Sequence, residues 1–348
     1  MSFTKEKREK IQRYILEKID SGCRDVSKRT ANAFDISLTT VYRYIKEMEE
    51  KNIIKKCEDT YELIEDLHTY VFRRDKNEIK DEDLIYRKYV EKEIADLPDN
   101  VQRIWCYAFT EMMNNAIDHS EADEVTVSVF RNYLYTAILL NDDGIGIFKK
   151  IKEYYNYISL DDAVSELFKG KLTTDSKNHS GEGIFFTSRA LDKFAAVSDG
   201  KIFSHDKYIE SMRNLRDSEV LKSWENRKGT VVFMVLSNYS KRTLKEVFDM
   251  FADVEGGFTK THIPIKHIYE DDPVSRSQAK RLCNRFDSFQ EVELDFKDVD
   301  EIGQGFAHEL FVVFQNRHKN VKLIPTNTSE DVERMIKHVI LSNTELEI

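Results

Sequence analysis

Glycine is scarce in this sequence, and half of it lies in three short motifs. The 348 residues contain 12 glycines. Six of them form the GxG pairs Gly144/Gly146, Gly181/Gly183 and Gly303/Gly305. Glycine has no side chain, so it lets the backbone take positive φ angles and pass close to a ligand. Because the first two pairs fall in one predicted domain, they indicate a binding site built from two loops.

Length and composition predict a folded protein with several domains. At about 100–200 residues per domain, the chain is long enough for two or three. The chain has only 4 prolines, which favours helices. Charged residues make up 33% of it, which predicts a densely charged surface. The 4 cysteines are far apart and form no CxxC motif, which argues against a zinc site and against a disulfide framework.

The sequence predicts neither a membrane span nor a secretory signal. No apolar run reaches the roughly 18 residues that a transmembrane helix needs. The charged segment Met1–Lys10 is not followed by the apolar stretch of a signal peptide. Widely spaced cysteines fit a reducing compartment. We therefore expect a cytoplasmic protein without membrane contact.

Charge is unevenly distributed along the chain. Residues 1–56 hold 14 Lys and Arg against 9 Asp and Glu, a net charge of +5, whereas the whole chain carries −10. A basic head on an acidic body predicts that only the head touches a polyanion such as DNA. The alternative is an accident of surface charge.

The basic head has the pattern of a winged helix-turn-helix. Apolar residues recur at helical spacing over 5–20, 26–34 and 37–51, and strand-like segments follow at 53–56 and 60–64. The last of these helices is the expected recognition helix in a DNA groove. The candidate DNA-contacting residues are Arg29, Thr39, Thr40, Tyr42, Arg43 and Lys46.

Two further expectations attach to this head. Winged helices also serve as protein-interaction modules, so a protein partner is the alternative to DNA. A homodimer is expected, because regulators of this kind commonly bind paired half-sites.

Four segments are expected along the chain. They are a winged helix-turn-helix over 1–64, a helical connector over 65–98, an α/β domain over 99–240 and a second α/β domain over 241–348. The connector is predicted to hold one or two helices, because its apolar residues have a helical period. Within the first α/β domain, residues 149–180 are polar and mixed, which is typical of a cover over a site.

Three polar residues share one face of a strongly periodic helix that is predicted from Asn100 to about His119. Glu111, Asn115 and Asp118 are spaced i, i+4 and i+7. An Asn amide oxygen is a good ligand for Mg²⁺, which also takes phosphate oxygens. A carboxylate one turn away can accept a proton from an attacking water or hydroxyl group. The pattern therefore indicates a Mg²⁺-dependent phosphate site.

The first two glycine pairs supply the rest of a nucleotide site. Asp142 ends a predicted strand just before Gly144 and Gly146, where its carboxylate can accept a hydrogen bond from an adenine amino group. The second pair lies at a predicted helix N-terminus, whose free amides favour phosphates. The motif KGT then opens a strand and brings the Thr230 hydroxyl near the base. The phosphate-binding candidates are Ser180, Gly181, Glu182 and Gly183.

In chain order, EMMNNAIDHS, DDGIGIF, GEGI and KGTVV resemble the N, G1, G2 and G3 boxes of the GHKL ATPases. That superfamily includes gyrase-type, chaperone-type, mismatch-repair and histidine-kinase nucleotide domains. The resemblance covers about 99–240 and implies a Bergerat α/β sandwich that binds ATP with Mg²⁺. It makes Glu111 the general base, Asn115 the Mg²⁺ ligand, Asp142 the adenine reader and 149–180 the ATP lid. It also makes Gly144 and Gly146 line the base pocket and puts the phosphates at Ser180–Gly183.

The C-terminal segment carries a second resemblance. SRSQAKRL followed by ELDFKDVDEIGQGFAHELF is similar to the STAS-like DUF4325 family. Such domains share the layout of anti-sigma-factor antagonists, so the resemblance implies a protein partner. In those antagonists a phosphorylatable Ser sits at a strand–helix turn. Here the turn reads Gly303, Gln304 and Gly305, so no switch is expected there.

Taken together, the sequence predicts a multidomain α/β regulator with a DNA-binding head, a Mg-ATP domain and a STAS-like tail. Binding or hydrolysis of ATP would switch its conformation. One alternative is a serine/threonine protein kinase of the anti-sigma type, acting on a STAS partner. Another is a defence or stress ATPase whose head binds a protein. The sequence leaves open whether ATP is hydrolysed, transferred or only bound.

Overall fold

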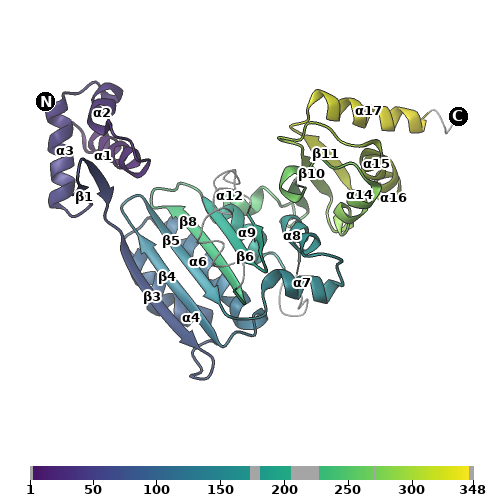
Figure 1. Cartoon of the computed structure of the whole chain (residues 1–348), viewed down its shortest axis with the longest axis horizontal. Helices are drawn as coiled ribbons and strands as arrows, with labels where there is room; N and C mark the ends of the chain where they lie inside the picture. Colours follow the sequence, from purple (N-terminus) through teal and green to yellow (C-terminus); the bar gives the residue numbers. More distant parts are fainter. Residues whose placement is uncertain (1–2, 173–180, 205–226, 270, 345–348) are drawn as a thin grey trace.

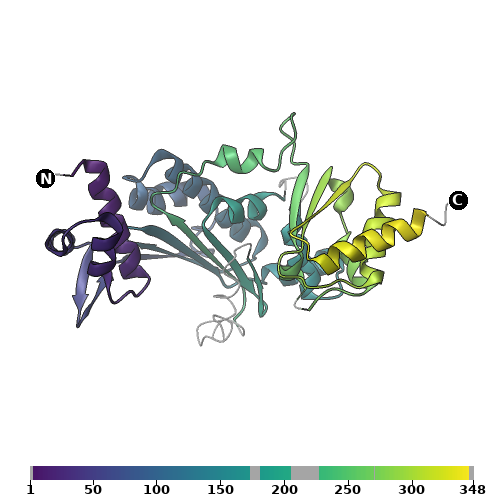
Figure 2. The same ribbon diagram turned by 90° about the horizontal axis from the view of Figure 1, so that it is seen from above.

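The computed structural model describes residues 3–172, 181–204, 227–269 and 271–344. It is a mixed α/β protein of three parts arranged in a row (Figure 1). A small helical head carries the N-terminus, a broad sheet with helices forms the middle, and a smaller α/β part carries the C-terminus. The head and the C-terminal part lie at opposite ends of the central sheet (Figure 2).

The head agrees with the predicted order of three helices and a two-stranded hairpin. Its elements are α1 (Lys5–Asp20), α2 (Val26–Phe34), α3 (Leu38–Glu50), β1 (Ile54–Cys57) and β2 (Thr60–Leu63). Asp35 adopts the left-handed conformation, with φ of 50°, and so turns the chain between α2 and α3. The Ser37 hydroxyl accepts a hydrogen bond from the Thr40 amide and so caps α3.

The central sheet has six strands, and every neighbouring pair is antiparallel. The order across the sheet is β3 (Asp66–Arg73), β4 (Glu124–Arg131), β5 (Tyr135–Asp142), β8 (Thr230–Ser237), β6 (Lys193–Ser198) and β7 (Lys201–Phe203). The strands that were predicted within 124–236 are all present.

Helices α6 (Asp99–His119) and α9 (Gly183–Ala190) pack together on one face of this sheet (Figure 2). The apolar stripe of α6, which includes Trp105 and Phe109, is fully buried. It belongs to the same core cluster as Ile138 of β5. Three short helical segments extend this layer: α4 (Glu82–Ile85), the π-helix η1 (Tyr86–Val90) and α5 (Glu91–Ile94).

The prediction of a purely helical connector over 65–98 is wrong for its first part. Residues 66–73 form the edge strand β3, which pairs with β4 over its whole length. Leu67 and Val71 alternate with Tyr70 and Phe72, and only the latter two join the core. This alternation is the period of a strand, and pairing with β4 decides the outcome. The helical pattern holds only from Glu82 onward.

The segment that was predicted as a cover also contains regular structure. It holds α7 (Ile147–Tyr155) and α8 (Leu160–Lys169), and residues 173–180 lie outside the described ranges. Helix α8 begins with a capping box at Ser159, and it buries Ala163 and Phe168. The apolar face of α8 is therefore part of the packed core.

The C-terminal part shows the predicted α/β alternation. Its three parallel strands are ordered β11 (Lys322–Thr326), β10 (Glu291–Asp295) and β9 (Lys260–Pro264). Helix α12 (Leu244–Asp249) leads into this part. Its own helical elements are α13 (Ile265–Ile268), α14 (Arg276–Leu282), η2 (Phe286–Ser288), α15 (Gln304–His308), η3 (Glu309–Phe314), α16 (Gln315–Arg317) and α17 (Glu330–Thr344). Among the described helices of the whole chain, none is long and apolar enough to cross a membrane.

The head rests on the central sheet through the turn between β4 and β5. Leu134, from that turn, is buried in the same cluster as Ile11 and Ile15 of α1. Beside it, the Arg13 guanidinium lies 5.5 Å from the ring centre of Tyr239, which follows β8. An apolar contact and a cation–π contact therefore join the head to the ends of two central strands.

The substitution Leu134→Ala tests this junction. Removing a buried leucine side chain costs about 2–5 kcal/mol, and here the loss falls on the contact with α1. We expect faster amide hydrogen exchange in α1, with exchange in β5 and β8 unchanged. The exposed Leu67 of β3 offers a matched control, since Leu67→Ala should alter stability by only about 0.5 kcal/mol. Equal effects of both substitutions would contradict the junction.

Candidate functional site

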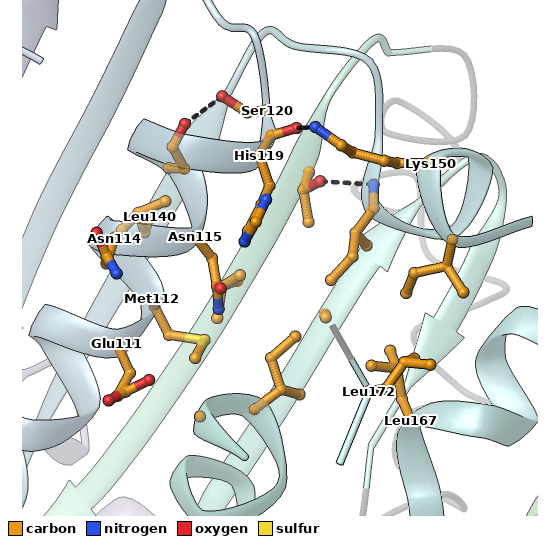
Figure 3. A pocket seen from close by; sticks show the side chains of 18 of the residues that line it. Glu111, Met112, Asn114, Asn115, His119, Ser120, Leu140, Lys150, Leu167 and Leu172 are labelled. Carbon is orange, nitrogen blue, oxygen red and sulfur yellow. Dashed lines mark hydrogen bonds between the residues drawn. The ribbon is translucent and has the colours of Figure 1, made fainter. Parts of the chain in front are cut away.

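A cavity of about 310 Å³ opens between α6, α7, α9 and the adjoining ends of β5 and β8. Glu111, Asn115 and His119 project toward it from α6, while Leu167 and Leu172 approach from the opposite side (Figure 3). The sequence candidates that line the cavity are Glu111, Asn115, Asp142, Gly146, Gly181, Gly183 and Thr230. Residues from four motifs, separate in sequence, therefore meet in one place.

The remaining candidates of this site do not line the cavity. Asp118 is exposed, and Gly144 and Glu182 lie beside the cavity wall rather than in it. An α-helix turns by about 100° per residue. Asp118 therefore lies between Glu111 and Asn114 around α6, although both of these line the cavity and Asp118 itself is exposed. Ser180 lies outside the described residues.

Asp142 is a buried acceptor at the end of β5. Its side chain is only 4% exposed, and its Oδ1 accepts hydrogen bonds from the amides of Gly144 (2.9 Å) and Thr230 (3.2 Å). Burial raises the pKa of this carboxyl group to about 6, against the opposing effect of the two amides. The two amides therefore fix the orientation of the carboxylate, but they do not fully offset the cost of burying its charge.

Glycine is required next to this carboxylate. Gly229 has a φ of 93°, and a Cβ atom there would lie 1.9 Å from the Asp142 carbonyl oxygen. Thr230 of the same KGT motif was a predicted site residue, whereas Gly229 was not. The Thr230 hydroxyl accepts a hydrogen bond from the Ile147 amide at 3.1 Å. Strand β8, strand β5 and the start of α7 are thereby locked together.

Gly144 and Gly146 also have packing roles. A Cβ on Gly144 would lie 2.1 Å from the carbonyl oxygen of Ser120, just after α6. Gly146 has a φ of 86°, and a Cβ there would meet the carboxylate of Asp199 at 2.6 Å. The turn after β5 is therefore pressed against both neighbours, and any side chain would force it apart.

The second glycine pair brings a helix end against Glu111. A Cβ on Gly183 would lie 2.1 Å from Glu111 Oε2, so the Glu111 carboxylate packs directly against the first residue of α9. The amides at a helix N-terminus carry partial positive charge, which favours a neighbouring anion. Burial raises the pKa of the neighbouring Glu182, while Lys171 lowers it. The site thus combines carboxylates with the N-terminal end of a helix.

Lys150 is a cavity residue that the sequence analysis missed. Its ammonium group donates to the His119 carbonyl at 2.6 Å and lies 3.8 Å from Glu121 (Figure 3). The only signal in the sequence is its position one helical turn after Gly146, at the start of α7. A cation therefore stands beside the polar face of α6.

The described ranges contain no group of three or more His, Cys, Asp or Glu side chains arranged to hold a metal ion. Asn115 is the one predicted metal ligand, and it lines the cavity. A single amide oxygen is a weak site for Mg²⁺, which binds proteins through one or two ligands plus substrate phosphates. These residues therefore fit Mg²⁺ only together with a bound phosphate group.

The DNA-binding candidates share the open surface of the head. Tyr42 of α3 is 56% exposed. Arg29, Thr39, Arg43 and Lys46 are exposed, and Thr40 is half-buried. The two basic residues of α3 form loose ion pairs within the helix, Arg43 with Glu47 at 3.7 Å and Lys46 with Glu50 at 3.8 Å. Exposed pairs of this kind contribute little to stability, so both cations can be recruited by another anion.

The substitution Asp142→Asn tests how costly the buried carboxylate is. Asn keeps the acceptor oxygen for both amides but carries no charge. The folded protein holds the Asp142 proton up to about pH 6, whereas the unfolded chain releases it near pH 4, so stability falls as the pH rises between these values. We expect Asp142→Asn to raise the free energy of unfolding by roughly 1–3 kcal/mol at neutral pH. The gain should shrink toward pH 4.

Urea unfolding at about pH 7.5 and about pH 4.5 measures this difference. The adjacent exposed Asp143, whose Oδ1 accepts the amides of Asp123 and Glu124, is the matched control. Asp143→Asn should give a much smaller gain, because the Asp143 charge is only a minor cause of the raised Asp142 pKa. A loss of stability in Asp142→Asn at neutral pH would show that the charge itself stabilises the fold.

Comparison with known proteins assigns one part of the chain. Residues 278–333 match the family model of a STAS-like domain of unknown function, DUF4325. This match begins in α14, includes β10 and β11, and ends in α17. No curated protein matches the chain. The C-terminal part of this α/β protein therefore contains a STAS-like domain.

Proposed function

We propose that the chain is a regulatory protein that binds Mg-ATP in the central cavity and DNA through its head. ATP binding or hydrolysis would change how the parts pack and hence the DNA affinity. One observation carries the nucleotide half of this proposal. The four motifs of the GHKL resemblance, far apart in sequence, contribute residues to a single cavity.

Each side of the cavity offers the chemistry that one part of ATP needs. The oriented Asp142 carboxylate is an acceptor for the adenine amino group, and Thr230 lies next to it. The α9 N-terminus, reached through Gly181 and Gly183, offers amides to phosphates. The volume of about 310 Å³ is at the lower end of the range for small-molecule sites.

Two residues of α6 would act on the phosphates. Asn115 would hold Mg²⁺ together with phosphate oxygens, and the bound ion would neutralise phosphate charge. Glu111 stands one turn away at the helix face, where its carboxylate can accept a proton from an attacking water. An antiparallel sheet covered by helices on one face is also the layout that the Bergerat resemblance implies.

The STAS-like domain favours a second candidate, a protein kinase that acts on a STAS partner. Glu111 could deprotonate a protein hydroxyl as readily as a water. The turn before α15 reads Gly303, Gln304 and Gly305, so the acceptor would lie elsewhere or in another protein. Transfer of labelled phosphate to protein, rather than its release, separates this candidate from an ATPase.

The nucleotide proposal is tested by Mg-ATP binding and turnover with two variants. Asn115→Ala should lose Mg²⁺-dependent ATP binding. Glu111→Ala should bind ATP normally, while turnover falls by about 10²- to 10⁴-fold, because general-base assistance is removed. Arg103→Ala serves as control, since Arg103 is exposed on α6 and outside the cavity lining. A wild-type protein that binds no ATP would end this half of the proposal.

The DNA proposal is tested by selecting binding sequences with the full-length protein and then measuring affinity. Arg43→Ala should weaken specific binding by about tenfold or more, because a base contact by Arg contributes about 1–3 kcal/mol of discrimination. Lys337→Ala removes an exposed cation from α17, at the opposite end of the molecule from the head (Figure 1), and should change nothing. Saturating Mg-ATP should shift the DNA affinity of the wild type. If the head binds a protein but no DNA, the result supports the alternative that it is a protein-interaction module.

A further inference from the structure

The wall of the cavity that faces α6 is a short strap of chain. It runs from the end of α8 to Leu172, and Leu167, Gly170 and Leu172 line the cavity. The Leu172 amide donates to the Gly181 carbonyl at 3.0 Å, so the strap also supports the second glycine pair. Whatever fixes the strap therefore fixes the side of the cavity that lies opposite Glu111 and Asn115 (Figure 3).

A buried ionic cluster fixes the base of this strap. Glu166 is 3% exposed and Lys169 is 0% exposed, and they pair with each other one helical turn apart on α8. The Arg285 guanidinium, from the C-terminal part, donates to the second oxygen of Glu166 at 2.9 Å. Burial lowers the pKa of Lys169, while Glu166 opposes this effect. Two cations thus share one buried carboxylate.

Backbone carbonyls on both sides complete the cluster. Arg285 donates to the carbonyls of Gly170, at 2.9 Å, and Lys171. In return, Lys169 donates to the Asn284 carbonyl and Lys171 to the Ser288 carbonyl, both at 2.9 Å. The strap and the segment 284–288 therefore hold each other through charge-assisted hydrogen bonds in both directions.

The backbone of Arg285 is held in an uncommon conformation. Its φ is 62°, in the left-handed region that non-glycine residues rarely adopt. Such conformations persist only where surrounding contacts compensate for them. Here the compensating contacts are those with Glu166 and the strap. If the STAS-like domain moved away, Lys169 and Glu166 would lose their partners from that domain, a costly change for buried charges.

We infer that Arg285 is a positioning residue of the nucleotide site, and that the STAS-like domain completes this site by holding the strap in place. Nucleotide affinity and the docking of the STAS-like domain are then thermodynamically coupled. Coupling is reciprocal, so ATP tightens the docking as much as the docking tightens ATP binding. This inference rests on the proposed binding of ATP in the cavity. It identifies the contact through which a partner of the STAS-like domain would control that binding.

The first test is Mg-ATP titration of the full-length protein and three variants. Arg285→Ala should weaken ATP binding by about tenfold, within the usual range of coupling between sites. Arg285→Lys keeps the charge but only part of the fork of donors, so its affinity should be intermediate. Lys337→Ala is the matched control, because it breaks an exposed ion pair with Glu333 within α17 of the C-terminal part. It should bind ATP as the wild type does.

The second test needs no substitution, so it holds even if Arg285→Ala fails to fold. Saturating Mg-ATP should slow amide hydrogen exchange in wild-type segments 166–172 and 284–288. Unchanged exchange in 284–288, or wild-type ATP affinity in a folded Arg285→Ala, would overturn the inference and leave the nucleotide site standing. Failure of the wild type to bind ATP would instead remove the proposed function, and the inference with it.

Discussion

The contact between the end of β5 and the start of β8 is the constraint on which the central part of the molecule depends. Gly229 approaches the Asp142 carbonyl so closely that no side chain fits there. The Thr230 amide and the Gly144 amide then hold the Asp142 carboxylate. An uncharged residue would be cheaper to bury at this point. The carboxylate makes sense where a ligand, rather than the fold, needs an oriented acceptor.

Much of the site could be predicted because its residues work through local spacing. The positions of Glu111 and Asn115 follow from the helical period, and the glycine pairs mark turns where a Cβ atom is excluded. Asp118 follows the same helical spacing but is exposed and does not line the cavity, so its place in the site stays a prediction. Strand β3 was missed because its short alternation of Leu67 and Val71 with Tyr70 and Phe72 was read as part of the helical period that follows it.

The ionic cluster under the strap could not be predicted from the sequence. Glu166 and Lys169 lie one turn apart on a helix, which is the usual spacing of an exposed surface pair. Only the arrival of Arg285 from a distant part of the chain encloses them. Nothing local to either segment marks this meeting. Buried ion pairs add little to stability compared with apolar packing, so their presence points to a constraint on geometry.

The two strands that meet at Asp142 also reach the head. Strand β5 begins at Tyr135, beside the Leu134 contact with α1, and ends in the cavity. Strand β8 runs the opposite way, from Thr230 to Ser237, just before the Tyr239 contact with Arg13. Eight residues of strand span about 26 Å, and paired strands transmit displacement as a unit. A proposed switch from nucleotide to head therefore requires a tilt of the head on these strand ends rather than a change within the sheet.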